Sequence, residues 1–208
     1  MLRDFSVLLF SVFLLASISS VDAARAQGLG LSAGANFNSL SDIETSSGEA
    51  TFDNASGWHL HLWFDLPVGP VAVRPGLRYM RMGELFTDVE LDSGTFDEDE
   101  VTTLLEIPID VRIRMGLPLI TPYVLLGPVL RFPANADDED RLESFSLAGG
   151  AGIGVELGLG GIKLYPELKY TFGITRFTQD SYEIGGVEIV PDEDQRLNAI
   201  MLSVGIGL

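Results

Sequence analysis

Two histidines and an aspartate on one alternating stretch are the first residues whose types could do chemistry. His59, His61 and Asp65 share one face of residues 56–66, because successive side chains of a strand point to opposite sides. Together they could bind a metal ion or form a His–Asp base in a hydrolase. Residues two apart on a strand lie about 7 Å apart by rise, so two imidazoles would need further ligands, and no nucleophile motif accompanies them. The pattern favours histidines that fill an interior, and we predict no catalytic residue, no cofactor and no enzyme.

A larger group of charged side chains lies on the polar faces of several alternating stretches. Residues 104–115 read LLEIPIDVRIRM, with aliphatic side chains on one face and acids and bases on the other. The two signs are nearly balanced on these faces, which suits a closed interior because an unpaired buried charge is costly. We therefore predict a network of paired charges inside the fold. Its predicted members are Arg74, Arg78, Glu106, Asp110, Arg112, Arg114, Glu156, Lys163, Glu167 and Lys169.

Acidic segments between these stretches give the chain its formal net charge of −17. A surface this acidic argues against nucleic acid as a partner, because phosphate requires a basic surface. Carboxylate oxygens suit divalent cations such as calcium, but the spacing lacks the calcium-loop signature. Solvation of an acidic surface, for example in a salty habitat, is therefore favoured over cation binding, and no metal site is predicted. The candidate ligands for the less favoured reading are Asp137, Asp138, Glu139 and Asp140.

Eight stretches alternate apolar and polar side chains and predict eight strands. They are residues 28–40, 56–66, 71–84, 101–115, 121–132, 143–157, 162–177 and 196–208. Alternation in 121–132 is poor, so its faces stay unassigned. Pro75 predicts a bulge or local break, because proline lacks a ladder donor. Strands of this length are long for a soluble sheet, and they suit tilted strands that cross a bilayer, which need about 9–11 residues.

The connections alternate between three short turns and four long acidic loops. Bacterial transmembrane barrels show this asymmetry, with short periplasmic turns and long external loops. The expected fold class is therefore all-β, an eight-stranded antiparallel up-and-down transmembrane β-barrel. A soluble barrel with an apolar interior, such as a lipocalin, is the alternative. Small residues and balanced charges on the polar faces, with aromatic residues toward strand ends, favour the membrane barrel, whose narrow lumen leaves no room for an open pore.

The first 26 residues read as a secretory signal peptide. Arg3 precedes an apolar run over 5–18, and Ala24-Arg25-Ala26 supplies a small-x-small cleavage site. The run is too short for the alternative, an N-terminal membrane helix, so we expect residues 27–208 to form one barrel domain. The chain contains no cysteine, which excludes disulfides, thiolate metal sites and a cysteine nucleophile.

With these residues in view, the chain resembles the PorT-like outer-membrane β-barrel domain family of the Bacteroidetes-type envelope. The matching pieces are Arg74-Pro75-Gly76-Leu77-Arg78-Tyr79 with Gly83, Leu105-Glu106-Ile107-Pro108, Pro122-Tyr123 with Gly127-Pro128, Gly152-Ile153-Gly154-Val155-Glu156, and Tyr170 with Gly173. These motifs are mostly structural, so the resemblance implies the fold and a location in the outer membrane. Leu208 departs from the C-terminal aromatic residue that is common in such barrels. The namesake of the family is linked to protein secretion, a role these motifs do not transfer.

Two functions of different classes follow from the sequence. The first is a non-enzymatic outer-membrane barrel with a side-chain-filled lumen, whose acidic loops serve envelope structure or surface binding. The second is a subunit of a secretion or transport assembly, which implies envelope protein partners. The lipid bilayer of the outer membrane is the expected partner in both cases. An enzyme of the outer membrane is the least favoured reading.

Overall fold

The computed structural model describes residues 28–45, 48–50, 52, 54–86, 89–91, 94–96, 101–116, 120–135, 141–159, 161–184 and 187–207. The predicted signal peptide, residues 1–26, and the candidate cation ligands at 137–140 lie outside the described residues. Within the described residues, no helix is both long and apolar enough to cross a membrane.

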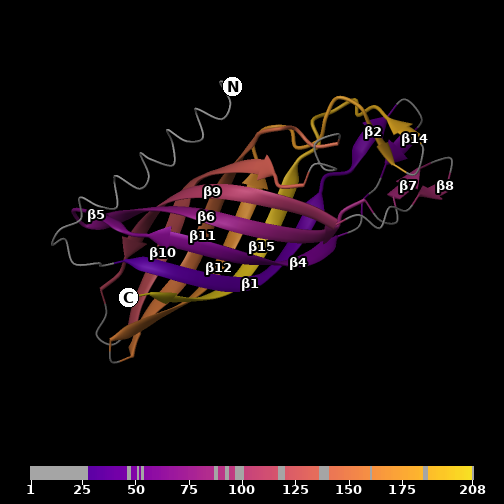
Figure 1. Ribbon diagram of the computed structural model, residues 1–208. Helices are drawn as coiled ribbons and strands as arrows, with labels where there is room; N and C mark the ends of the chain where they lie inside the picture. Colours follow the sequence, from indigo (N-terminus) through magenta and orange to yellow (C-terminus); the bar gives the residue numbers. More distant parts are fainter. Residues whose placement is uncertain are drawn as a thin grey trace, which may run out of the picture.

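Eight long strands form the wall of a closed barrel (Figure 1). They are β1 (Leu29–Leu40), β4 (Ala55–Phe64), β6 (Val71–Glu84), β9 (Val101–Arg114), β10 (Ile120–Pro133), β11 (Ser146–Leu159), β12 (Ile162–Gly173) and β15 (Leu197–Gly207). Each strand pairs antiparallel with the next in this order, and β1 pairs with β15 to close the cylinder. The predicted eight-stranded antiparallel up-and-down barrel is confirmed.

The strand bounds follow the alternating pattern closely and depart from it where the chain turns into a loop. Residues 71–84 form β6 over their whole predicted length. Residues 162–177 do not all belong to a strand, because β12 ends at Gly173. Beyond it, the amide of Ile174 donates to the carbonyl of Leu147 at 2.9 Å and that of Phe177 donates to Gln195 at 2.8 Å. These bonds join the segment to the first residues of β11 and to the loop before β15, outside a regular ladder.

Of the bulge or local break predicted at Pro75, the structure shows the break. The β6–β9 pairing is interrupted at Gly76 and Leu77, and the register is the same at Pro75 and at Arg78, so the proline introduces no bulge. The register shifts instead between Arg81 and Gly83, where Gly83 has a φ of 88°. A left-handed conformation of this kind suits glycine because it lacks a Cβ.

Three of the long connections contain a small hairpin that the sequence analysis did not predict. The hairpins are β2 (Ile43–Thr45) with β3 (Gly48–Ala50), β7 (Val89–Leu91) with β8 (Gly94–Phe96), and β13 (Tyr182–Ile184) with β14 (Val187–Ile189). Figure 1 shows β2, β7, β8 and β14 gathered beyond one end of the barrel. We call this end the loop end, and we call the opposite end, where β1 begins and β15 ends, the terminus end. At the terminus end, β5 (Leu66–Val68) pairs with the start of β6 around a turn at Gly69.

The barrel wall is apolar on its outer face and polar on its inner face. Exposed aliphatic side chains occur on the outer face of each strand, among them Leu62, Ile113 and Val204, and the exposed fraction of Val204 is 58%. The guanidinium-bearing Arg74 and the carboxylate-bearing Glu106 are both fully buried inside. This distribution is the reverse of the one expected for a barrel in water, where apolar side chains fill the interior.

Candidate functional site

Arg74 on β6 is the centre of an ionic cluster in the half of the lumen nearer the terminus end. Its Nε donates to Oδ1 of Asp65 at 2.8 Å, and its Nη1 donates to Oε1 of Glu167 at 2.5 Å. Arg112 on β9 pairs with the same aspartate at 2.9 Å and with Glu156 at 3.3 Å. Two bases therefore share three acids, which offsets the cost of removing these charges from water.

Glu106 on β9 forms a second cluster with two arginines. Its Oε2 lies 2.9 Å from Nη1 of Arg78, and its Oε1 accepts a hydrogen bond from Nε of Arg131 at 2.8 Å. The remaining guanidinium nitrogens of Arg131 donate to the carbonyl of Leu197 at 2.9 Å and the hydroxyl of Thr171 at 2.8 Å. Arg131 was not among the predicted network members, although it is 2% exposed and has three partners.

Lys169 and Asp110 form a third pair that spans the lumen. The Nζ of Lys169 on β12 donates to both carboxylate oxygens of Asp110 on β9, at 2.7 and 2.6 Å. Since β9 and β12 are not neighbours in the sheet, the pair crosses the interior of the barrel. The bond from Arg74 on β6 to Glu167 on β12 crosses it in the same way. These bridges fill the cross-section that an open channel would need.

At the terminus end of the lumen, the charged side chains of the network become exposed. Lys163 pairs with Glu156 at 2.7 Å, but its side chain is 47% exposed. Arg114 is exposed at the last position of β9, and it joins no ion pair with any other described residue. The structure therefore brings nine of the ten predicted residues into ion pairs and places Arg114 outside them, because the wall that would enclose its side chain ends there.

Aromatic rings pack beside the ionic cluster on the terminus side. The ring centroid of Tyr165 lies 5.8 Å from that of Trp63 and 6.2 Å from that of Tyr123. The guanidinium of Arg74 lies 4.9 Å from the Trp63 centroid, within cation–π range. The hydroxyl of Tyr123 donates to Glu167 at 2.6 Å. The rings and the charges thus form one packed unit.

Glycines on the neighbouring strands make the space for these rings, since Gly30 pairs with Trp63 and Gly154 pairs with Tyr123. A Cβ added at Gly30 would lie 2.3 Å from the ring of Trp63, and one added at Gly154 would lie 2.4 Å from the ring of Tyr123. Neither position could carry a side chain without moving an aromatic ring. The small residues that the sequence places on the inner face are therefore complements of the large ones.

His59 and His61 face the lumen from β4 and are buried, but they do not form a site with Asp65. That carboxylate is held by Arg74 and Arg112. The ring of His61 stacks at a tilt near Trp63, with centroids 5.3 Å apart. Among the residues that the structure describes, no three histidine or acidic side chains are grouped so as to bind a metal ion. The arrangement supports the interpretation of these histidines as lumen filling.

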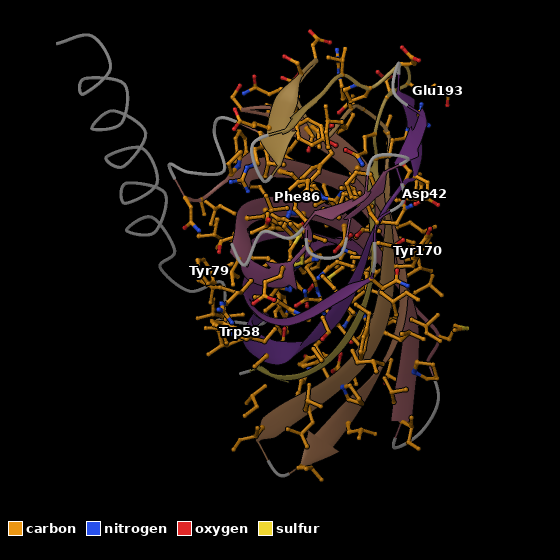
Figure 2. The ribbon with its side chains drawn as sticks, turned by 90° about the vertical axis from the view of Figure 1, so that its right-hand side faces the viewer. Asp42, Trp58, Tyr79, Phe86, Tyr170 and Glu193 are labelled. Carbon is orange, nitrogen blue, oxygen red and sulfur yellow. The ribbon has the colours of Figure 1, made fainter. Side chains whose placement is uncertain are left out.

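An apolar cluster closes the loop end of the lumen. Strand residues such as Met80, Leu104 and Met201 contribute to it from the wall, and Phe86 and Tyr182 contribute from the loops. The centroids of these two rings are 5.8 Å apart. Further loop residues in the cluster are Leu85, Leu142, Phe177 and Ile189. In Figure 2, Phe86 lies nearer the barrel than the loop residue Glu193.

Polar bonds hold the loops over this cluster. The hydroxyl of Tyr182 donates to Oε1 of Gln195 at 2.8 Å, and Nε2 of Gln195 donates to the carbonyl of Ser41 at 3.1 Å. Burial raises the pKa of Tyr182 above its ordinary value, because the phenolate would lose its hydration. The sequence analysis predicted only acidic loops here, and the buried apolar residues that anchor them were missed. The signal was the isolated pairs of large apolar residues within acidic segments, such as Leu85 and Phe86.

Comparisons with known proteins find likeness in structure only. No family model matches the chain, and no curated protein matches it. Neisserial surface protein A (NspA) shares 14% identity, with 88% of this chain and 98% of NspA covered and a TM-score of 0.49. Ail, the attachment invasion locus protein of Yersinia pestis, shares 14% identity over 87% of this chain and 99% of Ail, with a TM-score of 0.42.

A third solved structure is similar to the same extent. The major outer membrane protein of Thermus thermophilus shares 17% identity, with 85% of this chain and 98% of that chain covered and a TM-score of 0.40. Identities and TM-scores of this size transfer no residue role to this chain. Membership of the PorT-like family stays a prediction.

Proposed function

We propose that this chain is a small, non-enzymatic outer-membrane β-barrel protein with a side-chain-filled lumen, and that its acidic loops serve envelope structure or surface binding. The observation that carries the proposal is the continuous apolar surface on the outer face of the barrel wall. We call this surface the apolar belt, and it includes Leu62, Ile113 and Val204. Proteins in water seldom expose a contiguous apolar surface of this extent, whereas a lipid-facing wall requires one. Most exposed aromatic side chains lie in its loop-end half, as in an interfacial girdle. They are Phe37, Trp58, Tyr79, Phe145, Tyr170 and Phe172, of which Figure 2 labels Trp58, Tyr79 and Tyr170, whereas the exposed Phe64 ends β4 at the terminus end.

Two exposed valines offer a matched test of the membrane assignment. Val204 lies in the belt and is 58% exposed, while Val190 lies in a loop and is 44% exposed. Val204→Arg should lower the free energy of unfolding from lipid vesicles by about 2–4 kcal/mol, because the guanidinium would enter hydrocarbon. Val190→Arg should change it by less than about 0.5 kcal/mol, since it stays in water. Urea unfolding followed by tryptophan fluorescence measures both, and two equally small effects would contradict a lipid-facing wall.

The filled lumen predicts that the barrel conducts no ions. The refolded protein in a planar bilayer should give no stable single-channel steps, because cross-lumen ion pairs and the apolar loop-end cluster occupy the interior. An open porin in the same membrane serves as the positive control. Reproducible ion-sized currents that depend on the amount of this protein would contradict the filled lumen and favour a transport role.

The loops supply the part of the proposal that concerns binding. Their acidic side chains are exposed in the described segments, for example Asp192 and Glu193, while the apolar residues beneath them are buried. Acidic loops that are anchored by buried apolar residues suit a basic partner better than mobile acidic loops would, because less ordering is needed on binding. Cross-linking in intact cells tests which partners the loops contact. A stoichiometric complex with envelope proteins would favour the alternative function, a subunit of a secretion or transport assembly.

A further inference from the structure

Two arginines stand apart from the other described bases, because they are exposed on the barrel wall toward the loop end. Arg81 lies between the buried Met80 and Met82, so its side chain points outward from β6. Arg196, immediately before β15, is exposed between the buried Gln195 and Leu197. The other described bases are in the lumen, at the terminus end or in the loops. A base on a lipid-facing wall is costly except at the headgroup level, where anionic groups surround it.

Arg196 differs from Arg81 in what lies below it on the wall. The outer faces of β1, β11, β12 and β15 form an open, shallow apolar groove of about 560 Å³. Its lining includes Ala33, Ile153, Pro166, Leu168, Leu202 and Val204. The small Ala33 and the short Pro166 leave the wall hollow there, between longer aliphatic neighbours. Arg196 immediately precedes β15, the strand that carries Leu202 and Val204, whereas Arg81 belongs to β6, which contributes nothing to the groove.

The distance between the charge and the groove matches one leaflet of a membrane. Leu202 is six positions after Arg196, which is about 20 Å along a strand. With a strand tilt of about 40°, this places Leu202 about 15 Å below Arg196 along the membrane normal. Half of a hydrocarbon core of about 30 Å is about 15 Å. A lipid with its headgroup at Arg196 and an acyl chain that follows the tilt of β15 therefore reaches the groove at the depth of the bilayer centre.

The guanidinium of Arg196 is available to such a headgroup. Its backbone is fixed, since its amide donates to the hydroxyl of Ser41 at 2.8 Å. The neighbouring acid Asp194 lies 3.7 Å from Nε of Arg176, which offsets its charge. Arg196 itself joins no ion pair within the described part of the chain. Phe172 is exposed on β12, the strand that pairs with β15, and aromatic side chains are enriched at the headgroup level of a membrane.

We propose that the wall formed by β1, β11, β12 and β15 binds one phosphate-bearing membrane lipid, with its phosphate on Arg196 and an acyl chain in the groove. This inference rests on the proposed membrane location and adds a specific ligand class to it. Charge complementarity selects an anionic lipid over a zwitterionic one, because Arg196 is the one described base above the groove and joins no ion pair with a described acid. The chain in the groove selects a lipid over free phosphate.

Native mass spectrometry of the detergent-refolded protein tests the proposal, with phosphatidylglycerol as the probe and phosphatidylcholine and inorganic phosphate as comparators. We expect one phosphatidylglycerol to bind more tightly than either comparator. Arg196→Gln should weaken its binding about fivefold, which corresponds to about 1 kcal/mol for one base near a membrane surface. Ala33→Phe, which fills the groove and keeps the charge, should weaken it by a similar factor. Arg81→Gln is the matched control and should change it less than about twofold.

Three outcomes would overturn the lipid site. They are equal binding of the two lipids, unchanged binding in both Arg196→Gln and Ala33→Phe, and a loss in Arg81→Gln as large as in Arg196→Gln. A dimer that occupies the groove in place of lipid would overturn it as well. In each case the barrel would still be folded, as judged by its heat-dependent migration in gels. A small effect of Val204→Arg in vesicles is the separate result that would overturn the membrane location.

Discussion

Glu106→Gln is expected to destabilise the barrel by about 3–5 kcal/mol, because it leaves two buried arginines without their shared counter-ion. Glu106 is fully buried, and its two oxygens face Arg78 at 2.9 Å and Arg131 at 2.8 Å. Glutamine keeps the size of the side chain and removes the charge. Arg131 would keep its bonds to Leu197 and Thr171, but Arg78 would lose its one ion pair in the described structure.

Lys163→Gln is the matched control for this change, because it also removes one member of a lumenal pair. The Lys163 side chain is 47% exposed, so loss of its contact with Glu156 should cost less than about 1 kcal/mol. Urea titration of both variants and the parent protein in the same lipid gives their free energies of unfolding. The dependence of this free energy on urea concentration should be the same in all three proteins, so that the differences are changes in stability. If Glu106→Gln cost no more than Lys163→Gln, the buried cluster would contribute little and its arginines would have to be solvated in the folded state.

The outer face of the barrel could be predicted from the sequence because only one constraint acts on it. Lipid accepts any apolar side chain, so the outward positions of β6 and β9 read as plain alternation, and their bounds follow from it. The inner face of β10 obeys a different constraint. Tyr123, Leu125 and Val129 are buried on this face together with Arg131, and the first two belong to an apolar cluster with Trp63 and Tyr165. Apolar residues on both faces of β10 remove the alternation. The faces of this strand could therefore not be assigned from the sequence, and Arg131 was not predicted to join the charge network.

The partners of each charge lie beyond what sequence patterns can give. Arg74 and Glu167 are 93 residues apart and meet across the lumen, where contact depends on the height of each residue in a closed and tilted sheet. Balance of sign predicts that such charges pair, but not which ones. The loop hairpins escaped prediction for another reason. Their three-residue strands are too short for alternation to show, and acidic residues such as Glu44 and Glu183 within them resemble those of an unstructured loop.

Trp63→Ala should cost about 3–5 kcal/mol of unfolding free energy, because it empties the largest fully buried side chain of the lumen. The ring packs against Tyr165 and under the guanidinium of Arg74, so both lose contact surface. Gly30→Val disturbs the same place from the neighbouring strand β1, since its Cβ would lie 2.3 Å from the Trp63 ring. Overpacking of this kind should cost about 1–3 kcal/mol. Gly158→Val is the control, because nothing lies within 4 Å of its added Cβ.

The double variant Trp63→Ala with Gly30→Val tests whether Gly30 is required because the Trp63 ring occupies the space that a side chain would fill. If it is, the valine enters the space that the indole leaves, and the double variant should be more stable than the sum of the two losses predicts, by about 0.5–3 kcal/mol. Urea unfolding of the four proteins in one lipid completes this cycle. Additive losses would mean that the glycine serves the strand backbone alone. A lumen filled by matched large and small residues has no spare volume for a solute, so a positive coupling here would also explain why the barrel should not conduct.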